Sequence, residues 1–306
     1  MRYINDVTAI NQTKPTALTL GKFDGIHKGH RKLLALLDDL ARERGLEKAV
    51  FTFNISPQAR ISHKKYRTLL TNEERKNMLE EMGTDILVEC RFNDAMRNME
   101  AEDFVRDIIV GAMKAKAVAA GTDFRFGKDR RGNGRMLQEM GKELGFETFI
   151  LEKESFEGHE ISSTYIREKL EAGEMQTVNR LLTYDFFVTG PVLHGAALGR
   201  KLGFPTINQI PPDEKLLPPK GVYKSITEID GGRYESITNI GTKPTVDGSY
   251  MGVETYIFDF DENVYGHFAK VYLLEHTRPE MKFSSLEELK GQLRSDTGDR
   301  LKEPVE

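Results

Sequence analysis

The stretch TALTLGKFDGIHKGH (residues 16–30) joins a short apolar run to a turn rich in glycine and histidine. The apolar run predicts a buried strand, and the leucines that follow at positions 33, 36, 37 and 40 predict a helix ending near Gly45. A helix that begins directly after such a turn exposes backbone N–H groups, which favour phosphate. The stretch therefore predicts an α/β fold with a phosphate site at the start of its first helix.

The same alternation of apolar runs and amphipathic stretches continues beyond this segment. Thr71 and Glu74 have capping-box spacing, which predicts the start of a helix that runs to Gly83. Further helices are expected over roughly residues 100–113 and before Gly145, where the second one ends. The later apolar runs are KAVFTFN (48–54), DILVEC (85–90), KAVAAG (116–121) and ETFILEK (147–153). Strands separated by helices over this length predict a Rossmann-like domain, a mostly parallel sheet with helices on both faces.

Near Tyr184 the pattern changes to strands separated by glycine, proline or aspartate turns. Helical signals return only at SSLEELKGQLR (284–294). We therefore predict two domains, 1–183 and 184–306. The second is predicted to be a small antiparallel β-barrel with a terminal helix.

Composition excludes several classes of protein. The 306 residues carry a net charge of −4 and no obvious basic face, so no nucleic-acid partner is expected. No stretch approaches the roughly 18 to 20 apolar residues of a membrane span, and the first residues lack the apolar core of a signal peptide. Cys90, the one cysteine, fits a reducing compartment. We expect a cytoplasmic protein, either a monomer or a weak homo-oligomer.

His27 and His30 are three residues apart, so the first helical turn can carry both imidazoles on one face. Gly21, Gly25 and Gly29 permit tight turning and close approach of a ligand. The pair can bind a phosphoryl group in transfer. A helix cap and a metal pair are alternatives that the residues alone leave open.

A second helix start has similar chemistry. In ISSTYIREKLEAGE (161–174), Ser162, Ser163 and Thr164 open the helix and Arg167 follows one turn later. Hydroxyls, free N–H groups and a guanidinium suit a polyphosphate. Serine capping with a solvated arginine is the alternative.

HKGH followed far downstream by SSTYIR resembles the H-x-G-H and S-S-T-x-I-R signatures of the nucleotidylyltransferase superfamily. The longer strings GKFDGIHKGH and GTDFRFGKDRRGN resemble the prokaryotic bifunctional riboflavin kinase/FAD synthetase family. The resemblance implies attack by the FMN phosphate on the α-phosphorus of ATP, which releases pyrophosphate and requires Mg²⁺.

That resemblance assigns roles to residues of the first domain. His27 and His30 would contact the reacting phosphates. ATP would be bound by Gly21, Phe23, Asp24, Gly29, Ser163, Thr164 and Arg167, and flavin by Pro57 and Asp123. Phe124 and Phe126 could border the flavin ring, although aromatic residues at alternating positions are more often core. One departure is Ile55-Ser56-Pro57, where the family usually has P-x-P around a histidine and only Pro57 is kept.

The segment GPVLHGAALGRKLGFPTIN (190–208), taken alone, predicts a hairpin unusually rich in glycine. It resembles the riboflavin kinase signature, with further matches at NIGTKPT (239–245) and VETYIFDF (253–260). By that resemblance Glu254 accepts the proton of the riboflavin 5′-hydroxyl as the hydroxyl oxygen attacks the γ-phosphorus. Without the resemblance, the sequence would predict only a solvated strand residue at Glu254. The other implied residues are Gly199, Arg200, Lys201, Gly203, Phe204 and Thr206 for ATP, and Thr206 and Asn208 for the metal.

This domain also departs from the family. Apolar residues occupy 196–198 where relatives tend to be polar and basic, Tyr256 replaces a frequent histidine, and Pro279 follows Arg278.

The leading hypothesis is a bifunctional enzyme that converts riboflavin to FMN and FMN to FAD. The first alternative is an FAD synthetase whose kinase domain is weak or regulatory. The others are a flavin-responsive regulator without turnover, and nucleotidylyl transfer to another phosphate ester.

Overall fold

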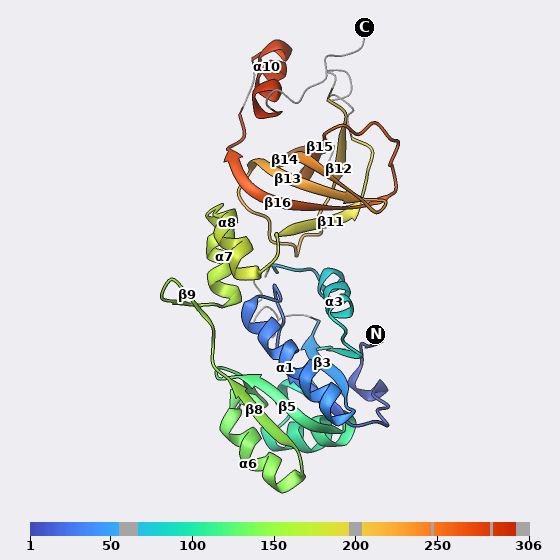
Figure 1. The fold of residues 1–306 in the computed structure, drawn as a ribbon, viewed down its shortest axis with the longest axis vertical. Helices are drawn as coiled ribbons and strands as arrows, with labels where there is room; N and C mark the ends of the chain where they lie inside the picture. The colour runs from blue at the N-terminus through green and yellow to red at the C-terminus, as the bar shows by residue number, and fades with distance from the viewer. Residues whose placement is uncertain (55–66, 196–203, 246–247, 282–283, 298–306) are drawn as a thin grey trace. The chain divides into compact units, whose positions relative to one another are not determined.

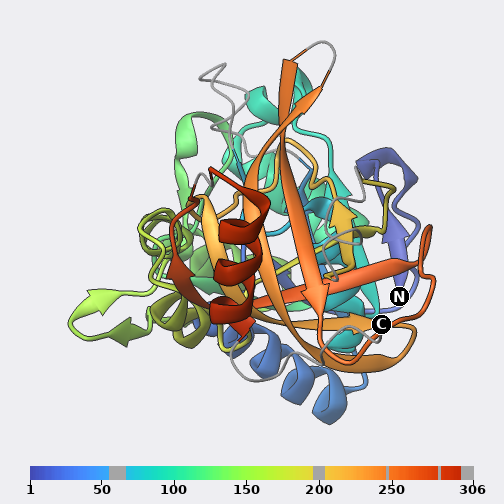
Figure 2. The same ribbon diagram turned by 90° about the horizontal axis from the view of Figure 1, so that it is seen from above.

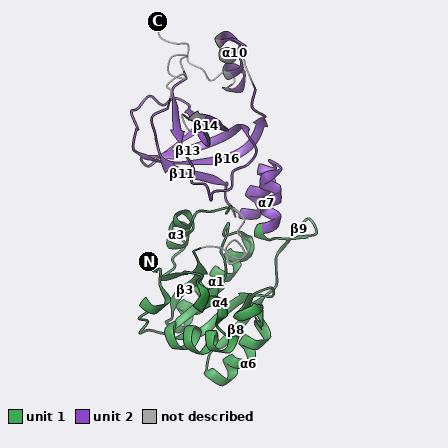
Figure 3. Ribbon diagram, turned by 180° about the vertical axis from the view of Figure 1, so that it is seen from behind, with its two compact units in different colours: residues 1–163 green, residues 164–306 purple. Residues whose placement is uncertain are grey.

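The computed structural model describes residues 1–54, 67–195, 204–245, 248–281 and 284–297. The chain divides into two compact units, Met1–Ser163 and Thr164–Glu306 (Figure 3). The predicted site residues Pro57, Gly199, Arg200, Lys201 and Gly203 lie outside the described residues.

The first unit alternates strands and helices along the chain (Figure 1). Its main elements are β1 (Arg2–Ile4), β2 (Thr16–Leu20), α1 (Lys28–Arg44), β3 (Glu47–Phe53), α3 (Asn72–Glu81), β4 (Ile86–Cys90), α4 (Asp94–Asn98), α5 (Ala101–Asp103), the π-helix η2 (Phe104–Ala112), β5 (Ala115–Gly121), α6 (Gly134–Leu144) and β8 (Glu147–Leu151). The short elements are η1 (Val7–Ala9), β6 (Arg125–Phe126), η3 (Lys128–Arg130), β7 (Gly132–Asn133), β9 (Ser155–Phe156) and β10 (His159–Glu160).

The sheet of the first unit has six strands in the order β1-β4-β3-β2-β5-β8, and every pairing is parallel. From β2 the chain proceeds outward through β3 and β4, then returns to β5 on the other side of β2. This reversal between β2 and β5 is the switch point at which open α/β sheets bind ligands. The predicted Rossmann-like fold is confirmed.

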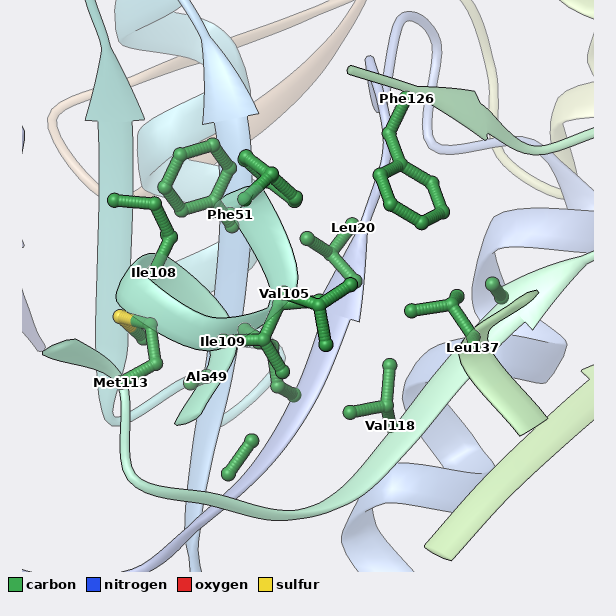
Figure 4. Packing of buried hydrophobic residues seen from close by; sticks show 14 of the residues in the cluster. Leu20, Ala49, Phe51, Val105, Ile108, Ile109, Met113, Val118, Phe126 and Leu137 are labelled. Carbon is green, nitrogen blue, oxygen red and sulfur yellow. The ribbon is translucent and has the colours of Figure 1, made fainter. Parts of the chain in front are cut away.

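Both faces of this sheet are covered. Ala17, Ala117 and Ala119 pack with leucines of α1 on one face. On the other face Leu18, Val118 and Ala120 pack with η2 and α6. Figure 4 shows Val118 in this cluster together with Val105 of η2 and Leu137 of α6. Burial on both faces explains why the strands read as continuous apolar runs.

The local signals for helix ends are confirmed. Gly45 and Gly145 end α1 and α6 in the left-handed conformation, and Thr71 and Glu74 form a capping box at α3. The helix expected over 100–113 differs, because its main part is a π-helix. Its wider turn brings Met113 N within 2.8 Å of Ile108 O, a pattern that hydrophobic periodicity does not distinguish from an α-helix.

The second unit begins with helices and continues as an antiparallel sheet. Its elements are α7 (Ser163–Glu171), α8 (Met175–Leu182), β11 (Phe187–Pro191), β12 (Thr206–Gln209), β13 (Gly221–Ile229), β14 (Gly232–Thr245), β15 (Gly248–Ile257), β16 (Phe268–Arg278) and α10 (Leu286–Thr297).

This sheet has the strand order β11-β16-β13-β14-β15-β12 and curls into a half-barrel. A bridge between Leu193 and Asn208 joins the segment after β11 to β12, so the two ends of the sheet approach each other. The buried Gln209 side chain donates to Gly190 O and Ala269 O across this junction. The predicted antiparallel barrel with its terminal helix is confirmed.

The long strands β14 and β15 run side by side in this barrel (Figure 2). Arg278, at the end of β16, pairs with Asp296 of α10 at 2.9 Å. None of the helices in the described part of the chain is long and apolar enough to cross a membrane.

Candidate active sites

The first candidate site lies at the switch point of the parallel sheet. The loop after β2 begins at Gly21, and the segment after β5 contains Asp123. The carboxyl ends of these neighbouring strands bring the loop and the segment together. The Asp123 carboxylate acts electrostatically on the His27 ring, so the two segments lie near each other.

The loop from β2 to α1 has an unusual backbone. Phe23 and Ile26 have φ angles of 49° and 38°, and Gly25 has a φ of 90°. A left-handed conformation is strained for non-glycine residues and needs support from its surroundings. Both Phe23 and Ile26 are fully buried, so core packing of their side chains holds this backbone in place.

The two predicted histidines lie together at the start of α1. Their ring centroids are 3.9 Å apart, and the Phe23 ring lies 4.8 Å from that of His30. Both Nδ1 atoms are buried and have no hydrogen-bond partner among the described residues. An unmatched buried polar atom costs about 1–3 kcal/mol, so this arrangement favours a polar ligand.

Burial sets the protonation of this pair. Desolvation lowers the pKa of His27 to about 4, and the nearby Asp123 only partly offsets it. Desolvation, with His27 adding to it, places the pKa of His30 well below its ordinary value. Both imidazoles are therefore neutral at pH 7 in this structure, and each retains one N–H to donate.

Gly21 and Gly29 make room for neighbouring rings. A Cβ at Gly29 would lie 3.3 Å from the His27 ring, and one at Gly21 would lie 3.2 Å from the Phe23 ring. These contacts are tighter than ordinary van der Waals distances. Because Gly21 and Gly29 have no side chain, the Phe23 and His27 rings can pack closely over the loop.

Asp24 ties the loop to distant parts of the unit. Its buried carboxylate accepts from Leu69 N at 2.8 Å, and its backbone carbonyl accepts from Ser163 Oγ at 2.7 Å. Ser163 is the first residue of α7, so two of the predicted ATP-binding segments are in contact. Thr164 and Arg167 follow on α7 and belong to the second unit; their contact with phosphate remains a prediction.

Arg75 is a residue of this region that the sequence did not reveal. Its buried guanidinium donates to Lys22 O and Phe53 O, both at 3.2 Å, and pairs with the buried Glu89. Arg75 thus fastens the loop after β2 to the ends of β3 and β4. It directly follows the capping-box residue Glu74, but no local pattern shows that its side chain turns inward.

Asp123, predicted to bind flavin, has an exposed side chain that pairs with Lys153 at 3.1 Å. Lys153 also pairs with Glu160 at 2.9 Å. Phe126, just beyond Asp123, is buried and packs on Phe104 with ring centroids 5.6 Å apart. Phe126 is therefore core, whereas Asp123 remains accessible to a ligand.

The second candidate site lies on one face of the barrel. Thr206 and Asn208 alternate along β12, and Asn208 lies directly opposite Glu254 of β15, so all three project from one face. Thr206 Oγ1 donates to Glu254 Oε1 at 2.8 Å. The three predicted residues are therefore assembled at one place in the sheet.

Lys243 completes this cluster, and the sequence did not single it out. Its Nζ lies 2.5 Å from Glu254 Oε2. Lys243 is within the NIGTKPT match, but its contact with Glu254 depends on how β14 pairs with β15. Gly195 also serves the cluster, because a Cβ there would lie 2.5 Å from Asn208 Nδ2.

Phe204, predicted to bind ATP, is buried against Tyr256, with ring centroids 5.6 Å apart in an edge-to-face contact. Burial raises the pKa of Tyr256. The tyrosine found at the position of a frequent histidine therefore packs as an aromatic residue beside the site.

Within the described residues, no group of three histidine, cysteine, aspartate or glutamate side chains could hold a metal ion. Mg²⁺ is commonly held by one or two protein oxygens together with substrate phosphates, and needs no such group. The Thr206 hydroxyl donates its proton to Glu254 and keeps lone pairs for a cation, and Asn208 adds an amide oxygen. These residues fit Mg²⁺.

Comparison with known proteins agrees with this geometry. The FAD synthetase family model matches residues 9–165, and the riboflavin kinase model matches residues 182–302. The chain is 35% identical over 300 residues to the bifunctional riboflavin kinase/FMN adenylyltransferase of Escherichia coli (strain K12), covering 97% of this chain and 96% of that protein. The chain belongs to this family.

Other relatives of the bifunctional riboflavin kinase/FMN adenylyltransferase family extend the comparison. The Bacillus subtilis (strain 168) protein of that name is 34% identical, covering 92% of this chain and 90% of its own. A crystal structure described as a macrolide-efflux protein from Streptococcus pneumoniae matches with a TM-score of 0.86 and 32% identity, over 96% of each chain. Both family domains are thus present here, with the histidine pair in the first and the Glu254 cluster in the second.

Proposed function

We propose that this chain uses ATP twice: to phosphorylate riboflavin to FMN at the Glu254 cluster, and to adenylylate FMN to FAD at the histidine pair. The observation that carries the proposal is the coincidence of each family match with a matching site. The FAD synthetase match contains the two imidazoles, whose Nδ1 atoms have no hydrogen-bond partner in the part of the chain that the structure describes. The riboflavin kinase match contains Glu254 between Thr206 and Lys243. We place the domain boundary at 183/184, close to the start of the kinase match.

For adenylyl transfer we assign phosphate contact to His27 and His30. The FMN phosphate is already an anion, so it can attack the α-phosphorus without giving a proton to a base. What the site supplies is position and donors for the charge that develops. Neutral imidazoles donate one N–H each, and a bound triphosphate would favour their protonation because opposite charge stabilises the cation.

The remaining assignments in this domain support the same nucleotide. Ser163, Thr164 and Arg167 hold ATP phosphates at the start of α7, and the backbone from Gly21 to Gly29 approaches the ligand. Asp24 acts by fixing the loop, since its carboxylate already accepts backbone N–H groups. Asp123 and Pro57 contact the flavin.

For the kinase reaction we assign proton acceptance to Glu254. The ribityl 5′-hydroxyl is a weak nucleophile, so its oxygen needs a base as it attacks the γ-phosphorus. Thr206 and Asn208 would hold Mg²⁺, which supplies charge neutralisation of the phosphate oxygens when bound. Gly199, Arg200, Lys201, Gly203 and Phe204 provide the ATP phosphate loop.

The proposed cellular setting is supported by the chemistry of the substrates and by the cysteine content. ATP and flavins are metabolites of the cytoplasm, and the single Cys90 is buried and free, as in proteins of a reducing compartment. We propose a cytoplasmic enzyme that is a monomer or a weak homo-oligomer.

A product assay tests the bifunctional proposal against an FAD synthetase with a weak kinase. Purified protein is incubated with ATP and Mg²⁺, and with riboflavin or FMN in separate reactions, and flavins are separated by chromatography. We expect FMN and FAD from riboflavin, and FAD from FMN. Formation of FAD from FMN but no product from riboflavin would remove the kinase claim.

A further inference from the structure

Both oxygens of the Glu254 carboxylate are engaged in this structure. Oε1 accepts from Thr206 Oγ1 at 2.8 Å, and Oε2 accepts from Lys243 Nζ at 2.5 Å. The two donors come from different strands, β12 and β14, on either side of β15. The carboxylate is thus held from both sides of its own strand.

Lys243 reaches Glu254 by an indirect route. Its partner in the ladder is Tyr250, so its side chain must run along β15 past Gly252. A Cβ at Gly252 would lie 2.8 Å from Lys243 Cγ, closer than real Cβ contacts allow. The missing side chain at Gly252 therefore leaves the space in which Lys243 lies.

A carboxylate with a single hydrogen bond can still rotate about its terminal torsion, whose energy profile is broad. A second, charge-assisted bond to the other oxygen removes that freedom and is shorter and stronger than a neutral one. A base must be oriented toward the proton that it accepts.

We propose that Lys243 is a positioning residue of the kinase site, which reaches past Gly252 to hold Glu254 in the orientation that accepts the riboflavin proton. The inference rests on the catalytic role proposed for Glu254. Lys243 itself does not touch the reacting atoms in this account. Gly252 contributes to the same arrangement, because its lack of a side chain leaves room for the side chain of Lys243.

The chain offers a matched control for this pair. Lys224 and Glu275 form another cross-strand pair of the barrel, at 2.8 Å between β13 and β16. Their side chains are 64% and 44% exposed, against 29% and 27% for Lys243 and Glu254. Exposed pairs contribute little to stability, so Lys224→Met should change neither folding nor activity.

The first test is Lys243→Met in the full-length protein, with steady-state kinetics of FMN formation from riboflavin. Loss of a charge-assisted bond that orients the base should lower kcat about 10- to 100-fold. We expect the KM values for ATP and riboflavin to stay within about twofold of those of the parent, because Lys243 does not contribute to binding of either substrate in the ground state. FAD formation from FMN should be unchanged, and Lys243→Arg should recover most of the lost kcat.

A second test leaves both charged groups in place. Gly252→Ala puts a methyl group 2.8 Å from Lys243 Cγ, and so displaces the lysine without removing it. We expect a smaller fall in kcat in the same direction, of about three- to tenfold, since the lysine can partly adapt. Combining Gly252→Ala with Lys243→Met should add little to the loss caused by Lys243→Met alone.

The outcomes distinguish the positioning role of Lys243 from the catalytic role proposed for Glu254. If Lys243→Met leaves kcat unchanged, raises it, or raises KM for ATP instead, Lys243 is not a positioning residue. If Glu254→Gln leaves FMN formation intact, the proposed role of Glu254 fails first. Loss of both FMN and FAD formation in Lys243→Met, with Lys224→Met normal, would mean that the substitution disrupts the fold and would also overturn the inference.

Discussion

The two candidate sites have opposite kinds of surroundings. At the end of the parallel sheet, the imidazoles of buried His27 and half-buried His30 are neutral, and their buried Nδ1 atoms have no partner among the described residues. On the face of the antiparallel barrel, a half-buried carboxylate is ionically paired with lysine and hydrogen-bonded to threonine. With the reactions assigned as proposed, the nucleophiles explain the difference: the FMN phosphate needs donors for its charge, whereas the riboflavin hydroxyl needs a base.

The side chains of the two sites are also kept in position in different ways. The loop from β2 to α1 has strained residues that are fixed by burial of Phe23 and Ile26 and by the inward-facing Arg75. The barrel site is fixed by strand register, which sets Thr206, Asn208 and Glu254 on one face. The geometry of the first site therefore depends on packing of the hydrophobic core, and the geometry of the second depends on the pairing of β12 with β15.

The largest effect should come from Glu254→Gln. Loss of the base is expected to slow FMN formation by about 10²- to 10⁴-fold, while FAD formation from FMN is retained. Separate product assays with riboflavin and with FMN measure both rates. A parallel fall in both would break the contrast between the sites.

The mirror experiment is His30→Ala. Removing one donor to the developing phosphate charge should slow FAD formation by about 10²- to 10³-fold. FMN formation from riboflavin should continue at the parent rate. Normal FAD formation by this variant would show that the imidazole pair is a structural feature.

The buried His27 should make the stability of the first unit depend on pH. Its folded pKa of about 4 is below the ordinary value of 6.5, so the unfolded chain binds the proton more tightly. Stability is therefore fully present above pH 6.5 and is lost as pH falls toward 4, by about 2 kcal/mol at pH 5.

Urea unfolding of the parent and of His27→Gln at pH 7 and pH 5 measures this dependence. The variant should lose less stability between the two pH values than the parent does. Equal losses in both proteins would contradict the burial of a neutral His27.

A smaller effect is expected from Thr206→Val, which keeps the shape of the side chain but removes the hydroxyl. Loss of one hydrogen bond to Glu254 and of one candidate metal oxygen should slow FMN formation by about tenfold. The Mg²⁺ concentration needed for half-maximal kinase rate should rise. An unchanged Mg²⁺ dependence would remove Thr206 from the metal site.

The sequence predicted most of the fold, because its signals were local. Continuous apolar runs gave the buried strands, the capping box at Thr71 gave the start of α3, and Gly45 and Gly145 gave helix ends. The π-helix was missed, since it has the same apolar residues as an α-helix would have. Leu34 is fully buried on α1, although the helix is predicted from the leucines at positions 33, 36, 37 and 40.

The sites were predictable only in part. The motifs singled out Ser163 and Glu254, whose roles stay predictions, but they did not single out the groups that hold these residues in place. Arg75 and Lys243 act through Glu89 and Glu254, which lie 14 and 11 residues further along the chain. The first contact exists only after α3 has packed against β4, and the second only after β14 has paired with β15. Local residue patterns carry no information on such contacts.

The central claim is that two independent sites perform successive reactions, and complementation tests it most directly. His30→Ala and Glu254→Gln are supplied with riboflavin, ATP and Mg²⁺, first separately and then as an equimolar mixture. The account predicts FMN alone from the first variant, almost no product from the second, and FAD from the mixture. A mixture of folded variants that forms no FAD, or a single variant that has lost both reactions, would contradict it.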